Sequence, residues 1–200
     1  MSEDFHDGTG DKLAQISLFS KFVRDQLKSE TVEIDEALGW ISEASDNLKK
    51  ETKDFLWALD AEVNSLYDVG MRLKEHGHAF FKRSETGINF EVIGLNDSLK
   101  SIMLPMDWKR NLLFIFKEAM SNSFKYSKCT KISLDFSVRD NKLSVNYSDN
   151  GQSFDLNYSK EGYGLKNMKR RAEKINGELV INLEPGKSTS IIFKGILPPP

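Results

Sequence analysis

A chain of 200 residues can form one large domain or two modest ones, and it can bury a hydrophobic core. Its formal net charge of −2 gives no electrostatic reason to expect binding to nucleic acid or to an anionic membrane. Cys129 is the only cysteine, which excludes a disulfide framework and a thiolate metal cluster and suits a reducing cytoplasm. No apolar run approaches the roughly 18 residues of a membrane span, and no signal peptide is visible, so we expect no direct membrane contact.

The first part of the chain has the spacing of two helices. One is expected over about residues 3–29, and a longer one from about Thr31 to Glu75, ending near Gly77. The apolar stripe of the longer helix contains Ile34, Leu38, Ile41, Leu48, Phe55, Leu59 and Leu66. So long a helix cannot bury this stripe against a shorter one. We therefore predict an antiparallel helical hairpin that dimerises as a four-helix bundle, with a monomeric all-helical domain as the alternative.

The rest of the chain mixes strands with helices. Strands are expected at residues 87–94, 131–138, 142–148, 177–183 and 188–197, and helices at residues 112–127 and 162–175. Arg139-Asp140-Asn141 and Glu184–Lys187 have the composition of hairpin turns. The pattern predicts an α+β fold, with a mixed sheet covered by helices on one face. This domain would span residues 83–200, after a helical domain of residues 1–82.

The segment from Asp149 to Ala172 has the features of a nucleotide site. Asp149 ends an expected strand, where its carboxylate can accept hydrogen bonds from an exocyclic amine, and Gly151 lets the backbone approach a ligand closely. Gly162 and Gly164 leave room for phosphates at the start of a helix, where free N–H groups favour anions. A hairpin turn followed by a flexible glycine loop is the alternative for either piece alone.

Glu118 and Asn122 lie four residues apart on the helix that precedes this segment, so they share one helix face. An Asn amide oxygen is a hard ligand that suits Mg²⁺. A carboxylate one turn away can position a metal-bound water or accept a proton. The alternative for this pair alone is a solvated helix face.

Four motifs in order resemble those of the ATPase superfamily of gyrase, the large heat-shock chaperone, mismatch-repair proteins and sensor histidine kinases. E-A-M-S-N-S-F-K-Y-S resembles the N box of the histidine kinases, D-N-G-Q-S-F their first Gly box, and G-Y-G-L-K-N-M-K-R-R-A their second. P-G-K-S-T-S-I-I-F-K-G-I-L-P resembles their final strand, so the resemblance covers about residues 87–198. The N-M-x-x-R-A variant is similar to the subfamily whose dimerisation helix carries H-D-x-x-x-Q, and this chain has His6-Asp7 near its start.

The resemblance implies a site for ATP and Mg²⁺. It makes Asn122 the Mg²⁺ ligand and Glu118 the residue that helps to coordinate or activate, with Lys125 near the phosphates. Asp149 would bind the adenine amine, and Thr189 would support it from the last strand. The further nucleotide-binding positions that it implies are Gly151, Gly162, Gly164 and Leu165, and the residues between Phe154 and Gly162 would form a short mobile lid.

His6 is the implied phosphoacceptor, and Asp7 is the carboxylate that assists it. A neutral imidazole nitrogen is a competent nucleophile near pH 7, and an adjacent carboxylate can orient the ring or take its proton. The resemblance implies a homodimer that phosphorylates His6 and passes the phosphoryl group to an aspartate of a response regulator. Because the chain starts almost on this motif, we expect a fragment that lacks an upstream sensor.

Three positions depart from the family pattern. Asp11 stands where the family has Gln, and a carboxylate cannot donate as an amide does and would repel an acyl phosphate. This change argues against phosphatase activity, for which Gln15 is a candidate substitute, and leaves kinase activity untouched. Ser153 replaces the second glycine of D-N-G-x-G, which can narrow the pocket, and Tyr126 replaces a common His with another hydrogen-bonding side chain.

Two other functions fit parts of the sequence. A degenerate, non-catalytic dimeric signalling scaffold would explain Asp11, Ser153 and the glycines that follow His6. An anti-sigma-type serine kinase with the same ATPase fold would explain the second domain but would leave the helical hairpin unexplained.

Two further clusters have simpler interpretations. His76 and His78 have the H-G-H spacing of a metal chelator, but a solvated helix end explains them without a metal. Lys125, Lys128 and Lys131 form a basic edge that is more typical of a soluble surface than of a nucleic-acid site.

Overall fold

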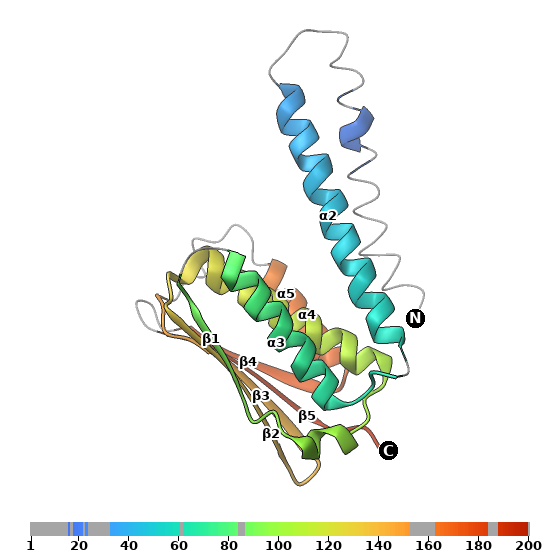
Figure 1. The fold of residues 1–200 in the computed structure, drawn as a ribbon, viewed down its shortest axis with the longest axis vertical. Coiled ribbons are helices and arrows are strands. Elements are labelled where there is room, and N and C mark those ends of the chain that lie inside the picture. Colours follow the sequence, from blue (N-terminus) through green and yellow to red (C-terminus); the bar gives the residue numbers. More distant parts are fainter. Residues whose placement is uncertain are drawn as a thin grey trace. The chain divides into compact units, whose positions relative to one another are not determined.

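The computed structural model describes residues 16, 18–21, 23, 33–60, 62–83, 87–152, 163–183 and 188–199. It divides the chain into two compact units, Met1–Trp57 and Ala58–Pro200. Figure 1 labels the helices and strands of both units. Of the helices in the described ranges, none is long and apolar enough to cross a membrane.

The described part of the first unit is helical. Residues 16, 18–21 and 23 are helical, and α2 spans Glu33–Leu59. The rings of Phe19 and Trp40 lie 5.1 Å apart, so an aromatic contact joins these two helical segments. Leu38 and Leu59 remain 49% and 50% exposed, which leaves part of the apolar stripe of α2 uncovered.

The predicted helix from Thr31 to Glu75 is two helices in the structure. α2 ends at Leu59, and α3 spans Leu66–Arg83. A capping box fixes the start of α3. Ser65 Oγ accepts from the Asp68 amide at 3.2 Å, and Asp68 Oδ2 accepts from the Ser65 amide at 2.9 Å. The prediction of one helix was wrong because apolar residues keep their helical spacing across the break.

Helix α3 belongs to the second unit. Its Leu66, Val69 and Leu73 side chains are completely buried, and the helix packs against α4 and β1. Gly77, near the predicted helix end, lies within α3, where a Cβ atom would come within 2.3 Å of the Phe90 ring on β1. The predicted boundary between residues 82 and 83 therefore falls inside the second compact unit, at the end of α3.

Among the described residues of the second unit, five strands form one mixed sheet. They are β1 (Asn89–Ile93), β2 (Lys131–Arg139), β3 (Lys142–Asp149), β4 (Gly177–Leu183) and β5 (Thr189–Ile196), in the order β1-β2-β3-β5-β4. β1 pairs with β2 in parallel, and the other neighbours are antiparallel. The predicted mixed sheet and both predicted hairpins are confirmed.

Helices α3, α4 (Met106–Asn122) and α5 (Tyr163–Lys174) cover one face of the sheet, as predicted (Figure 1). Leu143, Val145 and Tyr147 of β3 are buried, because alternate strand side chains point to the helical face. On α4, the buried apolar side chains are Trp108, Leu112, Leu113, Ile115, Phe116, Ala119 and Met120. The core therefore lies between α4 and the middle of the sheet.

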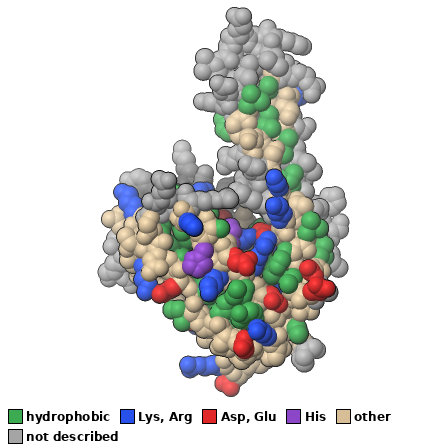
Figure 2. Space-filling model, in the orientation of Figure 1, with side chains coloured by type: hydrophobic (Ala, Val, Ile, Leu, Met, Phe, Trp, Pro, Cys, Tyr) green, Lys and Arg blue, Asp and Glu red, His purple; other side chains and the backbone are tan. Residues whose placement is uncertain are grey.

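Two short elements connect these layers. The 3₁₀-helix η1 (Asp97–Ser101) precedes α4, and the π-helix η2 (Ser123–Ser127) follows it directly. Basic and acidic side chains are interspersed on the described surface that Figure 2 shows, in keeping with the formal net charge of −2.

Candidate functional site

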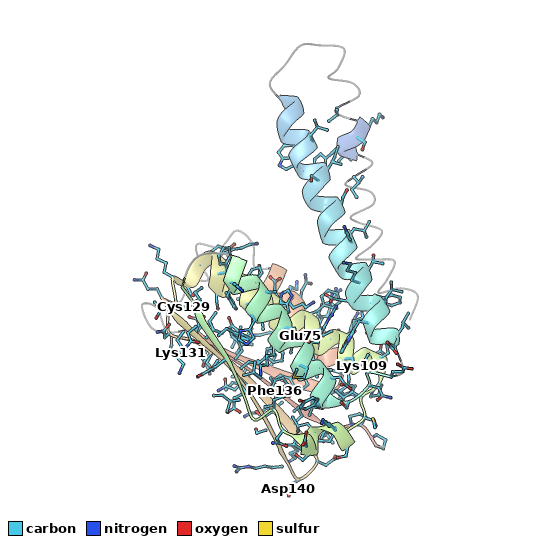
Figure 3. All side chains as sticks on the ribbon, in the orientation of Figure 1. Glu75, Lys109, Cys129, Lys131, Phe136 and Asp140 are labelled. Atoms are coloured by element: carbon cyan, nitrogen blue, oxygen red, sulfur yellow. The ribbon has the colours of Figure 1, made fainter. Side chains whose placement is uncertain are left out.

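The candidate site lies at one end of the sheet, where β3 ends and β5 begins. Asp149 is the last residue of β3 and pairs in register with Thr189, the first residue of β5. Cys129 and Lys131 mark the same end of β2 in Figure 3, and Asp140 marks the opposite end. Asp149 and Thr189 are each only 3% exposed. A buried carboxylate is costly unless it accepts hydrogen bonds, so its donors define the site.

Each carboxylate oxygen of Asp149 has a donor. The Gly151 amide donates to Oδ1 at 3.0 Å, and the Ser123 hydroxyl donates to Oδ2 at 2.6 Å. The Tyr147 hydroxyl in turn donates to Ser123 Oγ at 2.8 Å. Three elements therefore meet at Asp149: the strand β3, the turn that follows it, and the π-helix η2.

Thr189 contributes a polar atom that the described residues leave unsatisfied. Its Oγ1 is buried and has no hydrogen-bond partner among the described residues. A buried hydroxyl without a partner is rare in folded proteins and marks a place for a ligand or a bound water. Because Thr189 lies directly across from Asp149, a hydroxyl and a carboxylate are available at one point of the site.

The first Gly box is fixed by close contact with the end of the N-box segment. A Cβ atom on Gly151 would lie 2.2 Å from the carbonyl oxygen of Ser127, so only glycine fits there. The Gln152 amide donates to that same oxygen at 2.6 Å. The turn after Asp149 is therefore held against η2 by backbone groups.

The second Gly box contacts the N box through Gly164 and Glu118. A Cβ atom on Gly164 would lie 2.5 Å from Oε1 of Glu118, so the first turn of α5 lies against the Glu118 side chain of α4. Leu165 follows in the same turn and is half-buried. The structure thus brings Gly164 and Glu118 together, as a site shared by the two motifs requires.

Asn122 is the last residue of α4, and like Glu118 it is half-buried. The chain continues into the five-residue π-helix η2. The residue that caps its end, Lys128, is in the left-handed conformation with φ 51°. Lys125 and Tyr126 of η2 are exposed. Sequence reasoning predicted an unbroken α-helix here and missed the π-helix, an element that is frequent at functional sites.

Sequence reasoning also missed two residues that contact Asp149 directly or through one hydroxyl. Neither Ser123 nor Tyr147 was among the predicted site residues, and each was covered only by an expected helix or strand. Part of the signal was available, because Tyr147 and Asp149 are two residues apart on a strand and share a face. Burial raises the pKa of the Tyr147 hydroxyl, and the nearby Asp149 charge raises it further, so this hydroxyl stays protonated and able to donate.

Two groups of predicted residues remain: those outside the described ranges, and the histidines of the H-G-H pair. His6, Asp7, Asp11, Ser153 and Gly162 lie outside the described residues. The H-G-H pair packs with aromatic rings inside α3 and is not a frayed helix end, which corrects the prediction. The His76 ring stacks on Phe80 at 5.8 Å, and His78 meets the edge of Phe90 at 5.5 Å.

A cavity of about 590 Å³ lies elsewhere, at the opposite end of β3. Its lining includes Asp140, Lys142, Asn176 and Lys194. Although Lys194 belongs to the final-strand motif, the lining contains none of the predicted site residues. The contacts of Asp149, and not this cavity, therefore locate the candidate site.

Comparison with known proteins agrees with this geometry. Residues 109–199 match the family described as histidine kinase-, DNA gyrase B-, and HSP90-like ATPase. The chain is 29% identical over 197 residues to the signal transduction histidine-protein kinase/phosphatase DegS of Brevibacillus brevis, covering 96% of this chain and 49% of that protein. It is 24% identical over 197 residues to the sensor histidine kinase LiaS of Bacillus subtilis (strain 168), covering 97% of this chain and 52% of that protein. The chain thus spans about half the length of these curated relatives.

Solved structures share the fold at lower identity. The histidine kinase AdeS of Acinetobacter baumannii superposes with a TM-score of 0.61 at 11% identity, covering 92% of this chain and 96% of that one. The histidine kinase domain from the Erythrobacter litoralis EL346 blue-light activated histidine kinase superposes with a TM-score of 0.58 at 13% identity, covering 96% of this chain and 94% of that one. The chain is therefore similar to sensor histidine kinases over nearly its whole length, and its residues 109–199 match the model of the histidine kinase-, DNA gyrase B-, and HSP90-like ATPase family.

Proposed function

We propose that this chain is the cytoplasmic core of a two-component sensor histidine kinase. In this proposal it binds Mg·ATP in the second unit, phosphorylates His6, and passes the phosphoryl group to an aspartate of a response regulator. The observation that carries the proposal is a buried, hydrogen-bonded Asp149 paired in register with Thr189, whose buried hydroxyl has no partner among the described residues. A domain that needed neither group for binding would have little reason to bury both.

The base of the nucleotide would be recognised by these two residues. A carboxylate oxygen has two lone pairs, and each oxygen of Asp149 uses one for an internal donor. The remaining lone pairs can accept from the exocyclic amine of adenine. The hydroxyl of Thr189 can donate to a ring nitrogen or to a bridging water.

The triphosphate would be held between α4 and α5. Asn122 would supply an amide oxygen to Mg²⁺, with Glu118 beside it and Lys125 near the phosphates. Gly164 lies in the first turn of α5, where free backbone N–H groups favour anions, and its contact with Glu118 fixes the spacing of the two motifs. Mg²⁺, when bound, neutralises charge on the phosphates, and the protein side chains do the positioning.

Transfer would use the His6-Asp7 pair of the first unit. A ring nitrogen of His6 forms a bond to the γ-phosphorus as the bond to the bridging oxygen breaks. ADP then leaves, and Asp7 orients the ring or takes its proton. We further propose that residues of the first unit form the dimerisation hairpin, because Leu38 on the apolar stripe of α2 is 49% exposed. The response regulator would then accept the phosphoryl group from His6.

The test is incubation of the 200-residue chain with Mg²⁺ and γ-labelled ATP, in wild-type, His6→Gln and Asn122→Ala forms. We expect acid-labile, base-stable label on the wild type and none on His6→Gln. Asn122→Ala is expected to lose label and Mg-dependent nucleotide affinity. Asn182→Ala, an exposed asparagine on β4, is the matched control and should label normally.

Each contrary result removes a different part of the proposal. Label that persists in His6→Gln discards His6 as the acceptor. Normal nucleotide binding and hydrolysis by Asn122→Ala discards the site assignment. If the wild type takes no label and shows no thermal stabilisation by ATP, the non-catalytic signalling scaffold explains the chain better.

A further inference from the structure

Two hydroxyl groups stand behind the Asp149 carboxylate, and the fold alone does not require either. Tyr147 occupies a fully buried position of β3 whose inward neighbours Leu143 and Val145 are apolar. Ser123 is the first residue of η2 and is 4% exposed. A phenylalanine and an alanine would fill the same places without burying two polar groups. The two buried hydroxyl groups of Tyr147 and Ser123 therefore call for a role at the site.

The direction of the hydrogen bonds is fixed by the number of protons. Ser123 has one hydroxyl proton, which it donates to Asp149 Oδ2 at 2.6 Å. Its oxygen must therefore accept from the Tyr147 hydroxyl, at 2.8 Å. Hydrogen bonds in such a chain polarise one another, so the Tyr147 proton strengthens the bond that Ser123 makes to the carboxylate.

The chain of donors also fixes the orientation of the carboxylate. Oδ2 is held by Ser123, and Oδ1 is held by the Gly151 amide of the turn that packs on Ser127. A carboxylate held at both oxygens cannot rotate about its last side-chain bond without losing a donor. Its free lone pairs therefore keep one direction before any nucleotide arrives, which reduces the cost of ordering them on binding.

We propose that Tyr147 and Ser123 are positioning residues that orient the Asp149 carboxylate for the exocyclic amine of adenine. Through this orientation they determine the preference of the site for adenine nucleotides. The inference rests on the proposed function, since it assigns these residues a task at the same ATP site. It differs from a purely structural role, in which the two hydroxyls only satisfy each other in the core.

The experiment measures the dissociation constants of ATP and of purine riboside triphosphate, which lacks only the exocyclic amine. Both are measured with Mg²⁺ for the wild-type chain, Tyr147→Phe and Ser123→Ala. The matched controls remove the same groups elsewhere. Tyr67→Phe removes a hydroxyl from α3 and keeps the ring under Lys100, and Ser133→Ala removes one from the Ser133–Ser148 pair of β2 and β3. Urea unfolding of every variant reports stability separately from binding.

We expect the wild type to bind ATP more tightly than the analogue. Tyr147→Phe and Ser123→Ala should each weaken ATP binding about threefold to tenfold and leave the binding of the analogue unchanged within about twofold. Only ATP has the amine that bonds to the Asp149 carboxylate, and that bond is worth about one net hydrogen bond. Ser123→Thr, which restores a hydroxyl, should recover part of the selectivity. The two control variants should keep the wild-type ratio.

Equal weakening of both nucleotides would overturn the inference and assign the pair a structural role. Unchanged ATP affinity in both variants would also overturn it, while leaving the proposed function intact. A wild type that binds neither nucleotide, or both equally, would instead overturn the use of Asp149 for the base and, with it, this inference. If Tyr147→Phe does not fold, Ser123→Ala makes the same comparison with a smaller change.

Discussion

At the scale of single residues, the site contains two glycines at which an added Cβ atom would come within 2.5 Å of a neighbouring atom. Gly151 and Gly164 both lie against the N-box segment, but the atoms that they meet differ in kind. Gly151 meets a backbone carbonyl of Ser127, whereas Gly164 meets the far end of the Glu118 side chain. The two glycines should therefore respond differently to the same substitution.

Gly164→Ala is expected to lower activity with little effect on stability. The new Cβ would stand 2.5 Å from Glu118 Oε1, and a flexible carboxylate can move away at small cost. Displacing that carboxylate from the proposed site should slow phosphoryl transfer about tenfold or more, since displacements near 1 Å are costly to catalysis. Initial rates of labelling with γ-labelled ATP measure the effect. An unchanged rate would mean that Glu118 has no part in the reaction.

Gly151→Ala is expected to act on stability. The new Cβ would stand 2.2 Å from the Ser127 carbonyl oxygen, and backbone cannot move away cheaply. We expect the free energy of unfolding to fall by about 1–3 kcal/mol, as for other overpacked sites. The control for both glycines is Gly39→Ala in α2, where a Cβ meets nothing within 4 Å. There the better helix propensity of Ala should raise stability by up to about 1 kcal/mol. Urea unfolding measures both, and equal stability of Gly151→Ala and wild type would contradict the close approach.

Tyr147 gives the protein a dependence on alkaline pH. Its pKa is raised above the ordinary value of 10.0, so above that pH the unfolded chain releases a proton that the folded chain keeps. The free energy of unfolding should therefore fall as pH rises, by at most about 1.4 kcal/mol per pH unit for one proton. Tyr147→Phe should show a shallower fall in urea unfolding measured above about pH 10. Burial also raises the pKa of the Cys129 thiol, but that contribution is common to both proteins and cancels. If the free energy of unfolding fell equally steeply with pH in Tyr147→Phe and in the wild type, Tyr147 would not be the source of this pH dependence.

At the scale of elements, the break between α2 and α3 is decided by polar groups. The Ser65–Asp68 capping box starts α3, and Lys109 of α4 holds the segment before it. The Lys109 ammonium donates to the carbonyl oxygens of Asp60 at 2.9 Å and Val63 at 3.1 Å. These carbonyls follow the end of α2, where helical partners are missing. Burial lowers the pKa of Lys109, because leaving water disfavours its charged form.

Lys109→Met should test this anchor. Methionine keeps a long apolar side chain but removes the donor, so two carbonyl oxygens lose their charged partner. We expect the free energy of unfolding to fall by about 1–3 kcal/mol, the usual range for such a loss. Lys142→Met, at an exposed position of β3, is the control and should change stability little. Equal effects of the two substitutions in urea unfolding would contradict a specific role for Lys109.

At the scale of the whole molecule, the position of α3 decides where the second unit begins. The α3 side chains Leu66, Val69 and Leu73 are fully buried in the second unit. Each buried side chain of this kind contributes about 1.5–3 kcal/mol to the free energy of unfolding. Removing all three would cost a large part of the 5–15 kcal/mol that stabilises a typical domain. A fragment of residues 58–200 is therefore expected to unfold cooperatively and to bind ATP, whereas a fragment of residues 83–200 is not.

Thermal unfolding followed by circular dichroism, with and without Mg·ATP, compares the two fragments. A cooperative transition for residues 83–200 equal to that for residues 58–200 would show that α3 is dispensable. It would also restore the boundary predicted from the sequence. Loss of cooperativity in both fragments would instead mean that residues of the first unit are needed for the second unit to fold.

Several features of the site follow from the sequence alone, because they depend on neighbours in the chain. The alternation of Leu143, Val145 and Tyr147 defines β3, and the Asp149-Asn150-Gly151 turn ends it. The same local rules predict the hairpins and the mixed sheet. Even the start of α3 was available, since Ser65 and Asp68 have the spacing of a capping box. The prediction of one helix followed the apolar stripe, which continues through the break, and did not use this spacing.

What the sequence could not decide is which distant side chains meet. The Ser123 hydroxyl meets Asp149 because the segment after α4 packs against the end of β3 and the turn that follows it. Gly164 meets Glu118 because α4 and α5 pack side by side over the sheet. Spacing along a chain fixes the face of an element on which a residue lies. Only the packing of the elements fixes the atom that the residue faces, and at this site those contacts join motifs that the sequence keeps far apart.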